Sequence, residues 1–172
     1  MRSVIALAWV VVVLGLIGNS IAAKEALLKS GKVTFLELAP VDPRSLMQGD
    51  YMALRFSIAN DVRRDVERDE PAGRPGSRRE KFATADGKIV ATLDADSVSH
   101  YKQLYDGSPL APGEILLRYR VRNGRVKFAT NAFFFEEGTA KRYEQARYGD
   151  FRVAPDGELL LTGLRDKALE PL

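Results

Sequence analysis

The chain has 172 residues, of which 45% are hydrophobic and 28% charged, and its formal net charge at pH 7 is +3. This length suits one modest domain with one additional element, and a charge so close to zero argues against nucleic acid as a partner. Because the chain contains no cysteine, a disulfide framework, a thiolate metal site and a cysteine nucleophile are excluded.

The N-terminal segment predicts a membrane anchor. Residues 3–23 carry no charged side chain, and about 21 residues in a helix cover roughly 30 Å, the thickness of the hydrocarbon core of a bilayer. The alternative is a cleaved secretory signal, with Arg2 as its basic start and Ser20-Ile21-Ala22 as its cleavage site. The length of the apolar run and the helical composition of Lys24–Lys29 favour the uncleaved anchor.

The anchor implies where the rest of the chain lies. A short N-terminal tail followed by a single span is typical of a signal anchor, which leaves the N-terminus in the cytoplasm and the following domain outside it. We therefore expect a single-pass protein of the inner membrane, with residues 1–30 as the anchor and residues 31–172 as a periplasmic domain.

Residues 35–56 predict two strands that flank a polar loop. Leu36 and Leu38 on the first strand, and three apolar residues on the second, alternate with polar neighbours, as in half-buried strands. Proline and glycine in the loop restrict and re-aim the chain. We take the loop and the start of the second strand as a candidate functional element: Asp42, Pro43, Arg44, Ser45, Gln48, Gly49, Asp50 and Tyr51.

The second strand opens on Gly49-Asp50-Tyr51-Met52-Ala53-Leu54-Arg55-Phe56, which resembles the signature of the bacterial GDYXXLXY protein family. Phe56 replaces the last tyrosine of that signature, so the ring is kept and the hydroxyl is lost. The resemblance continues through Val41–Ser45 and from Phe133 to Leu164. It implies a membrane-anchored protein that accompanies multi-spanning membrane proteins, and it implies no particular activity.

Residues 60–81 are rich in charge, glycine and proline and contain few large apolar side chains. Such a segment buries too little surface to offset the entropy lost on ordering it, so we expect a charged, mobile loop. Its first part, Asp61–Glu70, is also compatible with a short solvated helix that Asp61 would cap.

Two further stretches predict hairpins from their turn residues. Residues 82–105 predict one around Asp86-Gly87, and residues 114–135 predict another around Asn123-Gly124. Alternation in the second hairpin places five basic side chains on one face: Arg118, Arg120, Arg122, Arg125 and Lys127. This basic face is a candidate contact surface for phosphates, acidic polysaccharide or lipid headgroups. The same pattern also suits the solvated face of an antiparallel sheet.

The C-terminal part predicts a short helix and a last hairpin. Thr139 is predicted to cap a helix that covers Phe133–Phe135, and Pro155-Asp156-Gly157 predicts the turn of the hairpin. Together the patterns predict about seven or eight short strands without long alternation of strands and helices. The predicted fold is mainly β (α+β): an N-terminal transmembrane helix followed by a small antiparallel β-barrel or sandwich domain with one short helix.

Three functions are compatible with these patterns. The favoured one is a non-catalytic accessory or interaction subunit of a multi-spanning membrane protein. The second is an envelope hydrolase that uses Ser45, or Asp42 with Asp50, although the pattern places no activating lysine beside Ser45. The third is a binding module for an anionic envelope ligand on the basic face. His100 is the single histidine and lacks nearby ligand partners, so we expect no metal site and no cofactor.

Overall fold

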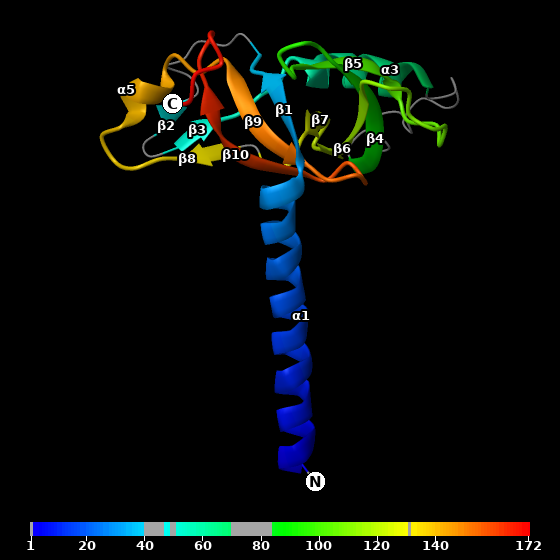
Figure 1. The fold of residues 1–172 in the computed structure, drawn as a ribbon, viewed down its shortest axis with the longest axis vertical. Coiled ribbons are helices and arrows are strands. Elements are labelled where there is room, and N and C mark those ends of the chain that lie inside the picture. The colour runs from blue at the N-terminus through cyan, green and yellow to red at the C-terminus, as the bar shows by residue number, and fades with distance from the viewer. Residues whose placement is uncertain (1, 40–46, 49–50, 70–83, 131) are drawn as a thin grey trace.

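The computed structural model describes residues 2–39, 47–48, 51–69, 84–130 and 132–172. A long helix, α1 (Arg2–Ser30), projects as a stem from a β-rich head formed by the described residues that follow it (Figure 1). The head is built from three antiparallel sheets with short helices at its edges. The predicted class, an apolar N-terminal helix followed by a mainly antiparallel β domain, is confirmed.

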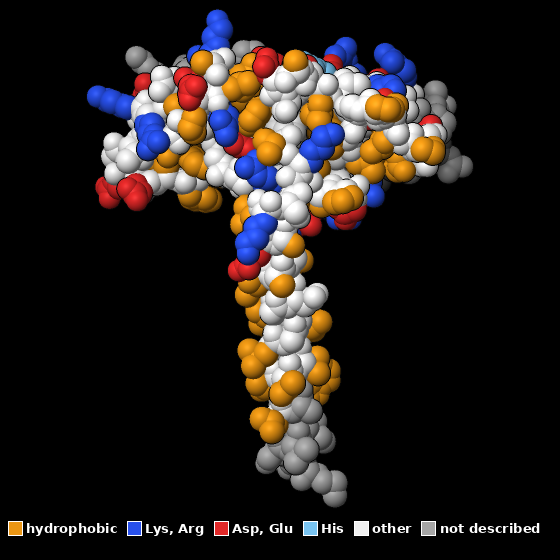
Figure 2. Space-filling view, in the orientation of Figure 1, with side chains coloured by type: hydrophobic (Ala, Val, Ile, Leu, Met, Phe, Trp, Pro, Cys, Tyr) orange, Lys and Arg blue, Asp and Glu red, His pale blue; other side chains and the backbone are white. Residues whose placement is uncertain are grey.

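Residues 3–23 of the stem carry no charged side chain, and this part of the helix projects away from the head (Figure 1). Residues Trp9–Ser30 are long and apolar enough to cross a membrane, and Trp9 and Leu16 are 66% and 67% exposed. Figure 2 shows hydrophobic side chains along the stem, whereas most charged side chains lie on the head. By length and composition this helix is either a membrane anchor or a signal sequence.

The first sheet joins the stem to the C-terminal hairpin. Its central strand β9 (Tyr148–Val153) pairs on one side with β1 (Lys32–Glu37) and on the other with β10 (Leu159–Arg165). The last predicted hairpin is therefore confirmed. Asp150 on β9 is buried and accepts hydrogen bonds from Arg165 (2.8 Å) and Arg152 (3.2 Å), so its charge is paired inside the head.

The second sheet has the order β5 (Ser99–Leu104), β4 (Thr84–Leu93), β6 (Glu114–Arg122) and β7 (Arg125–Lys127). The hairpin of β6 and β7 turns at Asn123-Gly124, where both residues have positive φ, as predicted. The predicted turn at Asp86-Gly87 is wrong, because both residues lie inside β4. A Cβ at Gly87 would lie 2.6 Å from the Tyr119 ring, so this glycine permits close packing and makes no turn.

The third sheet is small and contains the start of the signature strand. It has the order β2 (Met47–Gln48), β3 (Tyr51–Ala53) and β8 (Ala132–Phe134). The expected alternation is confirmed here, since Met52, Leu54 and Phe56 are buried. Their positions two residues apart place them on one side of the chain, toward the core.

Helix α3 (Ile58–Asp69) occupies much of the segment that was expected to be a charged loop. It begins before Asp61, which lies in its first turn and does not cap it. The helix is not fully solvated, because Ile58 and Val62 are buried and Val66 packs against the core. This spacing of four residues puts the three side chains on one helix face. Residues 70–83 lie outside the described part of the chain.

A single helical turn, α5 (Ala140–Tyr143), packs on Phe133 and Phe135, while Phe134 between them is 74% exposed. The Tyr143 ring lies 5.1 Å from the ring centroids of both Phe133 and Phe135. The predicted cap is wrong, since the Thr139 hydroxyl donates a hydrogen bond to the carbonyl of Glu136 (2.6 Å) and does not cap the helix. The Thr139 hydroxyl is therefore used in the tight turn that precedes the helix and not as a cap.

Three aromatic rings join the sheets in the core. Phe56, which follows β3, contacts Phe128 after β7 and Phe151 on β9, at ring-centroid distances of 6.4 and 5.4 Å. Both contacts are edge-to-face, the arrangement that the ring quadrupoles favour. All three rings are at most 4% exposed.

We expect Phe56→Ala to lower the free energy of unfolding by about 3–5 kcal/mol, because it leaves a cavity where the three sheets meet. Phe134→Ala is the matched control, since Phe134 is 74% exposed and its loss should cost less than about 1 kcal/mol. Urea unfolding followed by circular dichroism measures both. Equal losses in the two variants would contradict the central role of Phe56.

The stability of the head should depend on Tyr101 at high pH. Burial raises the pKa of Tyr101 above its ordinary value, and the hydrogen bond of its hydroxyl to Asp65 on α3 (2.6 Å) raises it further. An unfolded tyrosine ionises near pH 10, so the stabilisation is complete below about pH 10 and is lost as the pH rises above it.

The Tyr101→Phe variant should therefore be less stable than the wild type near neutral pH. Its free energy of unfolding should also fall less steeply than that of the wild type between about pH 10 and 11.5. Urea unfolding of both proteins at a series of pH values measures this difference. The two proteins differ only in the hydroxyl of residue 101, so parallel profiles would show that Tyr101 does not carry the effect.

Candidate functional site

The predicted functional loop lies largely outside the described residues. Asp42, Pro43, Arg44, Ser45, Gly49 and Asp50 belong to that part of the chain, and the hydrolase hypothesis depends on them. Gln48 and Tyr51 are described and pair with each other between β2 and β3. The half-buried Tyr51 ring lies 5.7 Å from that of Phe134, which gives it a packing role at the start of the signature strand.

The β6–β7 hairpin carries basic residues on one face, but their side chains meet different surroundings. The register pairs Arg120 with Lys127 and Arg122 with Arg125, which places them on one face of the hairpin. Arg122 forms an ion pair with Asp86 (2.7 Å). Hydrogen bonding to Arg122 lowers the pKa of Asp86, and the same contact raises the pKa of Arg122. The other four basic residues line two separate hollows.

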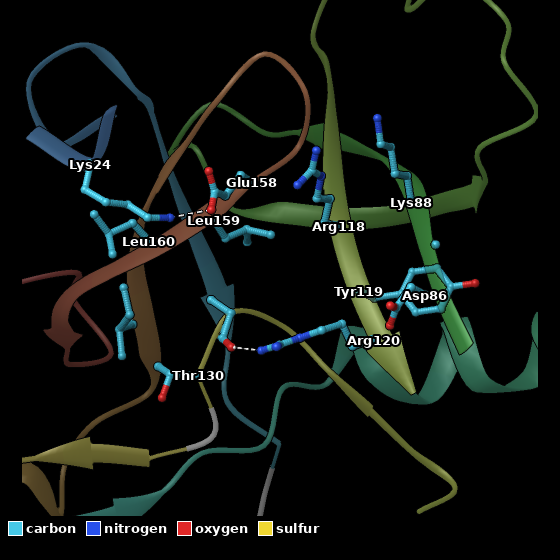
Figure 3. A pocket seen from close by; sticks show the side chains of 13 residues that line it. Lys24, Asp86, Lys88, Arg118, Tyr119, Arg120, Thr130, Glu158, Leu159 and Leu160 are labelled. Carbon is cyan, nitrogen blue, oxygen red and sulfur yellow. Dashed lines mark hydrogen bonds and ion pairs between the residues drawn. The ribbon is translucent and has the colours of Figure 1, made fainter. Parts of the chain in front are cut away.

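The first hollow, which we call the stem-side groove, lies between β4 and β6 on one side and the β9–β10 hairpin on the other (Figure 3). Its volume is about 730 Å³, and its lining includes Lys24 from the stem, Lys88, Arg118, Arg120 and Glu158. An apolar wall is supplied by Leu159, Leu160 and Leu161. The groove thus brings the stem, a sheet and the last hairpin together.

Most cations of the stem-side groove already have partners. Lys24 pairs with Glu158, Arg118 pairs with Asp156 (2.6 Å), and Arg120 donates to the carbonyl of Ala129 (2.5 Å). Lys88 has no ion-pair partner in the part of the chain that the structure describes. These contacts hold the stem and the hairpin against the sheet, and they leave little free charge for an external anion.

The second hollow, which we call the signature pocket, has a volume of about 510 Å³. Four basic residues line it, namely Arg55, Arg63, Arg125 and Lys127, and its apolar lining includes Leu54, Phe56 and Phe128. Residues 53–56 come from the end of β3 and the segment that follows it, while Arg63 comes from α3. The basic-face pattern indicated Arg125 and Lys127, whereas Arg55 and Arg63 join them only through the fold.

The single histidine has a local structural contact. His100 Nε2 lies 2.9 Å from Asp94 Oδ2, and this hydrogen bond, with those from the backbone N–H groups of Val98 and Asp96, lowers the pKa of Asp94. Within the described ranges there is no group of three or more His, Cys, Asp or Glu side chains that could hold a metal ion. The contact closes the turn between β4 and β5.

Comparison with known proteins identifies one family. The family model of the GDYXXLXY protein matches residues 13–164, which include the end of the stem and nearly the whole head. No curated protein and no solved structure matches the chain.

The packing of the β9–β10 hairpin on β6, beside the stem-side groove, should depend on Gly157. This residue has φ of +90°, its carbonyl accepts a hydrogen bond from the Arg118 N–H (2.7 Å), and an added Cβ would lie 3.2 Å from Leu116 Cβ. We expect Gly157→Ala to cost about 2–3 kcal/mol of unfolding free energy, through backbone strain and crowding against β6.

The matched control is Gly107→Ala, because Gly107 also has positive φ (+96°) but has no heavy atom within 4 Å of an added Cβ. It should lose only the strain component, about 1 kcal/mol. Urea unfolding of both variants separates the two costs. Equal destabilisation would mean that the contact of Gly157 with β6 does not constrain the groove.

Proposed function

The chain belongs to the GDYXXLXY protein family, and from this membership and the geometry of the stem we propose that it is a non-catalytic accessory subunit of a multi-spanning membrane protein. In this proposal α1 crosses the bacterial inner membrane once and the head lies on its periplasmic side. The partner contacts both the stem, within the bilayer, and the face of the head that surrounds the stem.

The observation that carries the proposal is the short, packed junction between stem and head. Only Gly31 separates α1 from β1, and its N–H donates to the carbonyl of Leu27 (2.8 Å). Leu27 is buried against the head, and the Lys24–Glu158 ion pair ties the stem to the last hairpin. A simple tether needs no such packing, whereas a subunit that docks on a membrane protein needs a fixed orientation of its head.

The surface of the stem gives independent support. Gly15, Gly18 and Ala22 lie on one side of the helix, and an added Cβ at either glycine would meet nothing within 4 Å. Small residues allow close approach of a second helix in a bilayer. Asn19 lies on the same side and brings an amide that favours a hydrogen-bonding partner in an apolar environment.

The proposal predicts that the small-residue side of the stem is required for partner binding. We expect the Gly15→Leu, Gly18→Leu double variant to lose a multi-spanning partner that wild-type protein retains in a mild-detergent pull-down from native membranes. The reason is that two leucine side chains would hold the helices apart. Quantitative mass spectrometry measures the ratio of partner to bait.

The control is Ser20→Leu, a small-to-large change on the other side of the same helix, which should leave the ratio unchanged. Recovery of the wild-type chain without a stoichiometric multi-spanning protein would contradict the proposal. The intact mass of the same bait tests the anchor, since a mature chain that begins at Ala23 would show that the stem is a cleaved signal.

A further inference from the structure

The signature pocket differs from the stem-side groove in the balance of its charges. Four basic residues line the pocket, and no aspartate or glutamate does so among the residues described. The groove instead contains Asp86 and Glu158 in its lining and has Asp156 beside Arg118. The groove is therefore largely neutralised from within, while the pocket keeps an excess of positive charge.

The cations of the signature pocket have few partners of their own. Arg63 lies 4.0 Å from Glu67 on the same helix, with both side chains about half exposed, so this ion pair is weak. For Arg55, Arg125 and Lys127 no ion pair exists with any residue that the structure describes. Four like charges around one hollow repel each other, and an anion between them would relieve that repulsion.

The four cations are held by separate elements that the core fixes in place. Arg55 lies between the buried residues Leu54 and Phe56, and its carbonyl accepts a hydrogen bond from Ala39 (2.8 Å). Arg125 and Lys127 are positioned by the register of β7 on β6, and Arg63 by the packing of Val62 on α3. The backbone supports of the pocket are therefore formed before any ligand arrives, which lowers the entropic cost of binding.

From this geometry we infer that the signature pocket binds a phosphate-bearing anion with at least two negative charges. Guanidinium groups bind phosphate oxygens through paired hydrogen bonds, and donors from several directions suit a tetrahedral anion. A volume of about 510 Å³ lies within the usual range of small-ligand sites and exceeds what one phosphate group fills. The partly exposed Ala53, Ala59 and Val126 in its lining offer apolar contact to the remainder of the ligand.

The same chemistry is found in a soluble phosphorylated compound and in the headgroup of an anionic lipid. The inference does not depend on the accessory-subunit role, because the pocket lies wholly in the head and shares no lining residue with the stem. Its test therefore fails or succeeds separately from the pull-down described above.

The test is calorimetric titration of inorganic pyrophosphate into the full-length protein in a neutral detergent at low salt. We expect binding by the wild type, and binding at least about tenfold weaker in the Arg125→Ser, Lys127→Ser double variant, because each change removes a charge-assisted hydrogen bond. Arg55→Ala, on another element, should weaken binding in the same way. Unchanged melting temperatures would show that both variants are folded.

The matched control is the Lys88→Ser, Lys141→Ser double variant, which removes the same amount of charge from the stem-side groove and from α5. It should bind pyrophosphate within about twofold of the wild type, since long-range attraction alone is screened by salt. Equal weakening in the control and in the pocket variants would overturn the inference, as would absence of binding by the wild type.

Mixed micelles distinguish the two sources of the phosphate. Phosphatidylglycerol that competes with pyrophosphate in the wild type, where phosphatidylcholine does not, would assign the pocket to an anionic lipid headgroup. Pyrophosphate binding that neither lipid affects would assign it to a soluble phosphorylated compound. Competition that persists unchanged in the Arg125→Ser, Lys127→Ser variant would place the lipid elsewhere and overturn the assignment.

Discussion

The edge-to-face contact of Phe56 with Phe128 and Phe151 is the constraint on which the head depends, because it connects β9 with the segments that follow β3 and β7, and these three strands belong to three different sheets. Phe56 occupies the last position of the family signature, where the family has tyrosine. Its ring is 4% exposed and surrounded by other rings, so this core uses the ring and has no need of the hydroxyl. Gly149 permits the approach, since a Cβ there would lie 3.0 Å from Phe56 Cε1. The aromatic ring at this position of the signature is therefore required for packing of the core.

The alternation of core-facing and outward-facing side chains in residues 54–56 also positions a residue of the signature pocket. Leu54 and Phe56 point into the core, and Arg55 between them lines the signature pocket. The residues that fix the strand are therefore the ones that fix the direction of Arg55. A long, flexible side chain loses less freedom on binding when its backbone is already held, so core packing and ligand binding are coupled through a single strand.

Local chemistry predicted those parts of the fold that depend on neighbouring residues. The apolar stem, the Asn123-Gly124 hairpin and the C-terminal hairpin all follow from short patterns. The prediction of a turn at Asp86-Gly87 was wrong because glycine is required there by the close approach of the Tyr119 ring from another strand. Helix α3 was underestimated because its buried face consists of few apolar residues among many charges. Likewise, Arg125 and Lys127 were predicted on a basic face, whereas their proximity to Arg55 and Arg63 is a property of the tertiary structure.

The two hollows show how the same kind of side chain serves two purposes in one small head. Near the stem, Lys24, Arg118 and Arg120 are paired with carboxylates or a carbonyl, and the Lys24–Glu158 ion pair ties α1 to the last hairpin. In the signature pocket, Arg63 has only a weak ion pair with Glu67, and the other three cations form no ion pair with any described residue. Thr130 is the single residue that lines both hollows among those described, and Arg120 holds the adjacent Ala129 at positive φ. Because the two sets of cations are otherwise distinct, orientation of the stem and capture of an anion can be changed independently by mutation, which makes the two proposals separable in one protein.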